Sequence, residues 1–339
     1  CLNELVHACR QKLLPRVCKA TGALALAAIL AVGSNFAPLY FTAQHTADTT
    51  RGGSELAAAT EDGNKSQNGL DLEYATAWSY GRTESLNMFI PDLMGGSSAQ
   101  PFSSDGPVAD VLSQFGVHPA NLPLGTYWGD QPGTAGPTYL GASIIFFAFL
   151  GLFVLEGRKK WWLLAVSILS LFLAWGSNMM WLTELCFKIL PGYNKFRAVS
   201  TALVIIQWTV PALACLVLSE LWKGEIPTDK LRKGRLWSVG TTGSIALFMA
   251  LFGGRIFSFS APGDLPLLYN IATYGGLDEA GARQFALMVS EAMEAERASI
   301  PRIDAWRSLL PVLISDGFVM LLMKGRNKNG VHRRCIAQR

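Results

Sequence analysis

The hydrophobic residues of this chain are gathered into long uncharged runs. Five runs of 18 to 24 residues contain no Asp, Glu, Lys or Arg, and a sixth, shorter run carries only Asp316 near its middle. A helix of about 20 apolar residues crosses the hydrocarbon core of a bilayer. The pattern predicts an all-α polytopic membrane protein with about six transmembrane helices, at residues 20–43, 138–155, 161–178, 198–219, 236–254 and 308–323.

The basic residues alternate along the connections between these runs. Every second connection is rich in Lys and Arg: Arg10, Lys12, Arg16 and Lys19; Arg158, Lys159 and Lys160; Lys223, Lys230, Arg232, Lys233 and Arg235; Lys324, Arg326, Lys328, Arg333 and Arg334. Cytoplasmic connections of membrane proteins carry such an excess. We therefore expect both ends to be cytoplasmic, with an amphipathic segment at 1–19 and a tail at 324–339.

Three extended connections are then expected on the outer side. Residues 46–135 contain three basic against eleven acidic residues, residues 179–197 suit a re-entrant or interfacial loop, and residues 255–306 form the third. Within the third, Phe285, Ala286, Met288, Val289 and Met293 share one helical face, which predicts an amphipathic helix on the outer surface. In the first run, Asn35 and Pro38 predict a kink.

Composition and cysteine spacing exclude some functional classes. The chain is 50% hydrophobic and 16% charged, with a net charge of +4 and no basic cluster interleaved with aromatic residues, so we expect no nucleic-acid partner. The six cysteines include no CxxC pair, and no His lies at ligand spacing, so neither a metal site nor a disulfide framework is predicted. Because the sequence starts with Cys1, we expect a fragment of a longer protein.

Two groups on the outer side are candidates for an anion site. Lys195 and Arg197 face outward against the usual charge bias, either as interfacial anchors beside aromatic residues or as ligands of a phosphate. Arg51 is followed by two glycines, whose backbone N–H groups can converge on an anion, although a plain glycine turn has the same pattern.

Two further candidates are polar groups in apolar surroundings. The stretch YWGDQPGT places Tyr127, Trp128, Asp130 and Gln131 at the mouth of the second run, as sugar or acceptor contacts or as interfacial anchors. Asp316 lies within a predicted span, where a carboxylate serves a proton or ion pathway or packs, neutral and hydrogen-bonded, against another helix.

Several stretches together resemble the YfhO-like family of bacterial integral membrane proteins, in its Bacteroides-type version. They are RGGSEL, GLDLEYATAWSYG, NMFIPDLMGG, YWGDQPGTAGPTYLGA, WGSNMMWLTELCFKILPGYNKFRAVS and AERASIPRIDAWRSLL. The resemblance implies a GT-C-like fold and a glycosyltransferase that moves sugar from a polyprenyl-phosphate donor to a cell-envelope acceptor. It further implies the bacterial cytoplasmic (inner) membrane as location, with membrane lipids and the lipid-linked sugar as partners.

The resemblance also implies roles for individual residues. The catalytic acid of GT-C enzymes lies in an early outer loop, which we expect upstream of Cys1. Lys195, Arg197 and Arg51 would bind the donor phosphate, with a divalent metal as an open option. Two other classes remain: a transporter or flippase of lipid-linked glycans, for which Asp316 is the best residue, and a scaffold that binds envelope proteins.

Overall fold

The computed structural model describes residues 14–45, 70–190 and 192–337, and in these ranges the regular elements are all helices. The expected all-α fold class is therefore confirmed. The chain divides into two compact units, residues 1–72 and 73–339, which are described separately. Arg51 lies outside the described residues.

The first unit contains one bent pair of apolar helices. Helix α2 (Leu14–Ser34) and helix α3 (Phe36–His45) meet at Asn35 with a bend of 67°. The side-chain amide of Asn35 donates to the carbonyl of Ala31, and Pro38 has no N–H to continue the ladder across the break. The predicted kink in this run is confirmed.

The second unit contains most of the candidate membrane-spanning helices. Three stretches are long and apolar enough to cross a bilayer: Val199–Lys223, Thr228–Ile256 and Glu279–Gly325. The bent pair in the first unit and a second bent pair, Lys159–Ala174 with Gly176–Ile189, raise the number to five if each pair is one span. The chain is thus a helical protein with three to five candidate spans in the described ranges.

The difference from six arises at the second apolar run. Residues 138–155 were expected to span, but helix α6 covers only Ala142–Val154, 13 residues. Gly141 precedes it with φ +103°, a conformation that a helix does not adopt, so the first residues of the run are a non-helical entry. Helix α6 is apolar but short for the hydrocarbon core.

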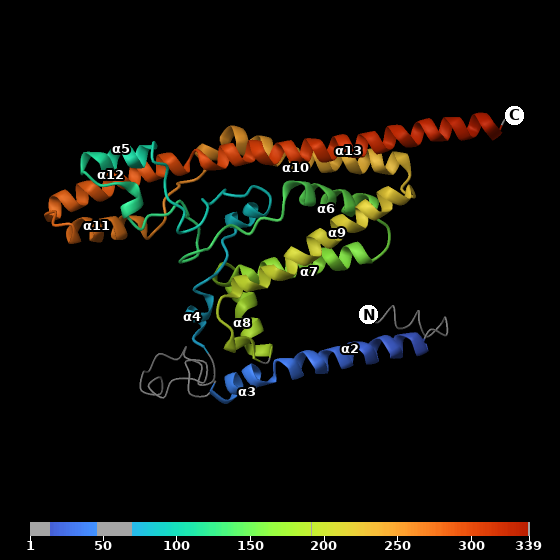
Figure 1. Ribbon diagram of the computed structural model, residues 1–339, viewed down its shortest axis with the longest axis horizontal. Coiled ribbons are helices and arrows are strands. Elements are labelled where there is room, and N and C mark those ends of the chain that lie inside the picture. The colour runs from blue at the N-terminus through green and yellow to red at the C-terminus, as the bar shows by residue number, and fades with distance from the viewer. Residues whose placement is uncertain (1–13, 46–69, 191, 338–339) are drawn as a thin grey trace. The chain divides into compact units, whose positions relative to one another are not determined.

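Helix α6 lies at the centre of the helical core of the second unit. It packs against α9 (Leu203–Lys223), α10 (Thr228–Ile256) and α13 (Ile300–Ala337), and α7 (Lys159–Ala174) packs against α9. Figure 1 shows α10 and α13 side by side along much of their length. The backbones come close because glycine leaves room: a Cβ on Gly151 would lie 2.6 Å from Val217.

Consecutive helices of this core alternate in direction. The connections α6–α7 and α9–α10 therefore lie at the same end of the core (Figure 1). The helix ends that border these connections are basic, and the Nζ of Lys230 in the first turn of α10 lies 2.7 Å from a carboxylate oxygen of Glu156 in the α6–α7 connection. The basic connections gather at one end, as the expected orientation requires, but which side of a membrane they face stays a prediction.

The opposite end carries the long polar segments. Helix α8 (Met180–Ile189) leaves the end of α7 at 115° after a short 3-10 helix, η4 (Gly176–Met179). Helix α12 (Glu279–Arg297) is the expected amphipathic helix, but its buried face packs against α5 (Pro107–Gln114) and α11 (Asp264–Tyr274). The face that the sequence assigned to an outer membrane surface is thus covered by protein.

Candidate functional site

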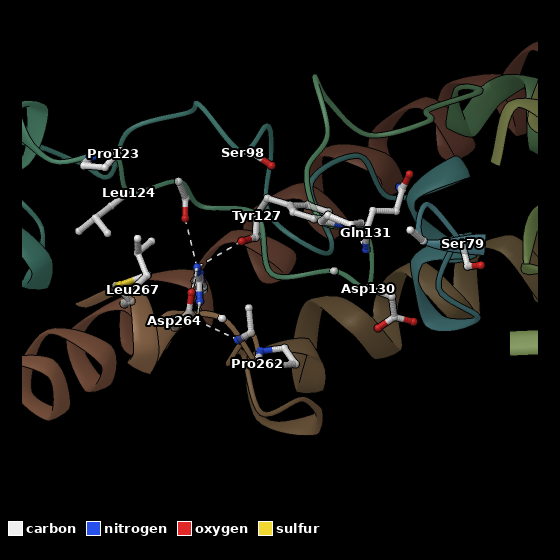
Figure 2. Close-up of a pocket in the computed structure, with 18 of the residues that line it drawn as sticks. Ser79, Ser98, Pro123, Leu124, Tyr127, Asp130, Gln131, Pro262, Asp264 and Leu267 are labelled. Carbon is white, nitrogen blue, oxygen red and sulfur yellow. Dashed lines mark hydrogen bonds and ion pairs between the residues drawn. The ribbon is translucent and has the colours of Figure 1, made fainter. Parts of the chain in front are cut away.

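A cavity of about 710 Å³ lies between the segment that follows α5 and the start of α11. Figure 2 shows Pro123, Leu124 and Leu267 at one end and Asp130 with Gln131 at the other, with Tyr127 between the two ends. One end therefore carries apolar side chains, with Asp264 next to them, and the other end is polar. Three of the four residues expected to contact a sugar, Tyr127, Asp130 and Gln131, line this cavity.

A buried acid holds two of these residues in place. Glu84, in the 3-10 helix η2 (Thr83–Met88), is only 2% exposed. One carboxylate oxygen accepts hydrogen bonds from the Tyr127 hydroxyl and the Gln131 side-chain amide, both at 3.0 Å, and the other accepts from the Gly81 N–H at 3.0 Å. Burial raises the pKa of Glu84, and burial also raises the pKa of Tyr127.

Asp130 is the carboxylate that remains open to the cavity. It is exposed, and its Oδ2 lies 3.4 Å from the side-chain amide of Asn178. Asn178 is itself fixed, since its side-chain amide also donates to the backbone carbonyl of Tyr80 and its backbone carbonyl accepts from the guanidinium of Arg82. The 3-10 helix η4, which follows α7, thus supplies an amide beside the acid, and the two groups can bind neighbouring hydroxyls.

The loop that carries these residues is clamped by Arg297, which is 1% exposed. Its guanidinium donates to the carbonyls of Gly125, Thr126 and Tyr127 at 3.1, 3.1 and 3.2 Å, and to the carboxylate of Asp264 at 2.5 and 3.2 Å. All three backbone carbonyls belong to the loop segment that leads to Asp130 through Trp128 and Gly129. Arg297 therefore joins α12 to the cavity wall.

Trp128, the fourth expected sugar contact, has a different environment. It is 9% exposed and packs against Phe257 and Phe259, with ring centroids 5.7 and 5.1 Å away. Its indole N–H is buried and has no hydrogen-bond partner. Trp128 lines a second cavity, of about 130 Å³, that shares Gly129 and Asp130 with the larger one.

The two outward cations lie in the segment that joins α8 to α9. The guanidinium carbon of Arg197 lies 4.1 Å from the ring centroid of Trp78 and 4.4 Å from that of Tyr74, so the cation stacks on both rings. The residues on either side of Trp78, Ala77 and Ser79, line the larger cavity. Lys195 ends the short 3-10 helix Tyr193–Lys195 and is half-buried.

Asp316 is paired within the helical core. Its Oδ2 lies 3.5 Å from Nη1 of Arg235 on α10, and the two side chains are 12% and 14% exposed. Asp316 Oδ1 and Arg235 Nε are buried without a hydrogen-bond partner. The acid thus has a counter-charge on the neighbouring helix.

In the part of the chain that the structure describes, no three His, Cys, Asp or Glu residues are grouped closely enough to hold a metal ion.

Glu84, Asn178 and Arg297 were not predicted as site residues. Of these three, only Arg297 could have been identified from the sequence pattern. It follows Val289 and Met293 at intervals of four and so lies on the apolar face of α12. A charge on such a face needs a buried partner. Glu84 and Asn178 meet the loop only through contacts between distant segments.

No family model matches the chain, and neither a curated protein nor a solved structure shows significant similarity to it. The resemblance to YfhO-like proteins therefore stays an expectation.

Proposed function

We propose that the protein takes part in glycosyl transfer at the outer face of a bacterial cytoplasmic membrane, and that the larger cavity holds a sugar from a polyprenyl-phosphate donor. The observation that carries the proposal is the polar end of this cavity, where Asp130, Gln131 and Asn178 converge beside the ring of Tyr127. A carboxylate and two amides supply donors and acceptors for hydroxyl groups, and an aromatic face suits the apolar face of a sugar ring.

The size and polarity of the cavity fit a lipid-linked ligand. Its volume of about 710 Å³ falls in the range of roughly 300–1,000 Å³ typical of small-molecule sites. The apolar end, with Leu124, Leu267 and Met293, suits a hydrocarbon part of the same ligand. A sugar attached to an isoprenoid through phosphate has both characters.

Arg197 supports a phosphate next to this cavity. The contacts with the rings of Trp78 and Tyr74 hold the guanidinium in place without using its N–H donors. Trp78 also donates from its indole to the carbonyl of Gly133, two residues after Gln131. The stacked cation is therefore coupled through one side chain to the loop that lines the cavity. In this proposal Lys195, two residues before Arg197 in the same segment, assists Arg197.

The alternative of transport depends on Asp316. An acid that carries protons must change its charge during the cycle, but Asp316 has Arg235 as a counter-charge on the adjacent helix. A carboxylate buried between packed helices needs a counter-charge, and Arg235 supplies it. The pairing therefore favours a structural role for Asp316.

The proposed orientation is tested by single-cysteine labelling in intact cells with a membrane-impermeant maleimide. On a cysteine-free background, a cysteine at exposed Asp278 should be labelled and one at Lys159 should react only after permeabilisation. Labelling of Lys159→Cys in intact cells would reverse the orientation and remove the outer cavity from the proposal.

The ligand is tested by binding to the purified full chain in nanodiscs. We expect Asp130→Ala to weaken binding of methyl hexosides about tenfold to a hundredfold, because a charged hydrogen bond contributes roughly 1.5–3 kcal/mol. Arg197→Gln should weaken binding of a short-chain polyprenyl-phosphate hexose by a similar factor, and more than binding of a methyl hexoside. The measurement is the dissociation constant of each ligand by thermophoresis.

Two exposed residues on α12 provide matched controls. Glu291→Ala removes an exposed acid and Arg283→Gln an exposed cation, and neither residue lines the cavity. Both should bind as the wild type does. Equal affinities for wild type and Asp130→Ala across the methyl hexosides would exclude the cavity as the sugar site.

A further inference from the structure

The smaller cavity adjoins the polar end of the larger one, and its chemistry differs. Gly129 and Asp130 line both cavities, whereas Trp128, Met94 and Phe257 line only the smaller one. At about 130 Å³ it is well below the roughly 300–1,000 Å³ of sites that hold a whole small molecule. It therefore suits a substituent of a ligand whose main part lies in the larger cavity.

We propose that the smaller cavity binds the acetamido group of an N-acetylated amino sugar whose ring occupies the larger cavity. This inference rests on the proposed function and names the class of sugar. An acetamido group has three features to satisfy: a carbonyl acceptor, an N–H donor and a methyl group. The walls of the cavity offer a partner for each.

The carbonyl matches the unpartnered indole of Trp128. An indole N–H can only donate, and this one is buried without an acceptor. A buried donor left without a partner costs about 1–3 kcal/mol, so a ligand acceptor that reaches this N–H gains a hydrogen bond for which the protein offers no competing acceptor. The amide carbonyl of a ligand is such an acceptor.

The N–H and the methyl group match the remaining walls. Asp130 is exposed at the boundary of the two cavities, where its carboxylate can accept from an amide N–H on the sugar ring. Glu84 also lines the smaller cavity, but its carboxylate already accepts three hydrogen bonds from the protein. Met94 and the ring of Phe257 give apolar surface for the methyl group.

The charges of this cavity argue against an anionic substituent. Asp130 and Glu84 are both acidic, and no Lys or Arg lines the smaller cavity. A phosphate or carboxylate there would meet like charge in a partly desolvated space. A neutral group with both a donor and an acceptor is the better match.

The test compares three ligands on the full chain in nanodiscs: methyl N-acetylglucosaminide, methyl glucoside and methyl glucosaminide. We expect the wild type to bind the N-acetylated sugar about fivefold to tenfold more tightly than the glucoside, the value of about one hydrogen bond. The amine sugar separates the acetamido contact from simple attraction to Asp130. Trp128→Phe keeps the aromatic packing but removes the donor. In this variant the dissociation constants of the glucoside and of the N-acetylated sugar should be about equal.

A second variant guards against a folding defect in Trp128→Phe. Ser258 is exposed and lines the smaller cavity, so Ser258→Phe fills the space from the surface and should also abolish the preference. A wild-type ratio near one, or a ratio unchanged in both variants, overturns the subsite while the proposed function stands. Failure of the wild type to bind any of the three sugars contradicts the proposed function itself.

Discussion

Replacement of Arg297 by methionine is expected to lower the free energy of unfolding by about 3–5 kcal/mol, because the change leaves the buried partner charge uncompensated. Arg297 is 1% exposed, and its loss strands Asp264 together with the carbonyls of Gly125, Thr126 and Tyr127. The same change frees the loop that lines the larger cavity, so binding of methyl hexosides should fall with stability. Thermal and denaturant unfolding of the purified protein measure the effect.

The control for this prediction lies on the same helix. Arg283 forms an exposed ion pair with Glu279, with both side chains 70% exposed, so Arg283→Met should change stability by less than about 1 kcal/mol. Arg297→Lys should recover only part of the loss, since an ammonium cannot reach all of the acceptors of a guanidinium. Equal unfolding midpoints for Arg297→Met and Arg283→Met would show that the clamp contributes nothing.

Replacement of Asp316 alone by leucine is expected to have an effect of similar size. Arg235 would keep its charge in the helical core, where its side chain is 14% exposed, without the acid 3.5 Å away. Removing one member of a buried pair costs about 3–5 kcal/mol, whereas replacing both with apolar residues is often neutral. The double variant Arg235→Leu with Asp316→Leu should therefore regain most of the lost stability.

Heat-induced unfolding in detergent of Asp316→Leu, of Arg235→Leu and of the double variant checks this expectation. The pair Lys230–Glu156 at the basic end of the core is the control, because Glu156 is 81% exposed and Lys230→Leu should cost less than about 1 kcal/mol. If the double variant is as unstable as the single variants, the charge of Arg235 is not what compensates the buried charge of Asp316. The hypothesis that Asp316 serves transport would then be favoured.

The helices of the core were predictable because long apolar runs have few alternatives to a helix in a membrane. The length of each helix could not be predicted from these runs. The run at 138–155 reads as a full span, yet its first residues are not helical, since Gly141 takes a conformation that local composition does not determine. The face of α12 was recognised, but its partners, α5 and α11, follow from tertiary packing.

The site was predictable where its residues are neighbours in sequence. Tyr127, Asp130 and Gln131 share one turn-rich stretch, and they line one cavity. Trp128, in the same stretch, packs against Phe257 and Phe259, which are distant in the sequence, so its surroundings could not be predicted locally. The buried acid Glu84 has no local pattern, since its meaning depends on two side chains more than 40 residues away.

The contacts of Arg297 also determine when this site can form. Its acceptors in the loop lie 170 to 172 residues earlier in the chain. At a synthesis rate of about 5–20 residues per second, the ribosome needs roughly 10–30 s to add the clamp after it has made the loop. During that interval the cavity wall is without its principal hydrogen-bond donor, and the nascent loop is open to proteases and chaperones at the membrane.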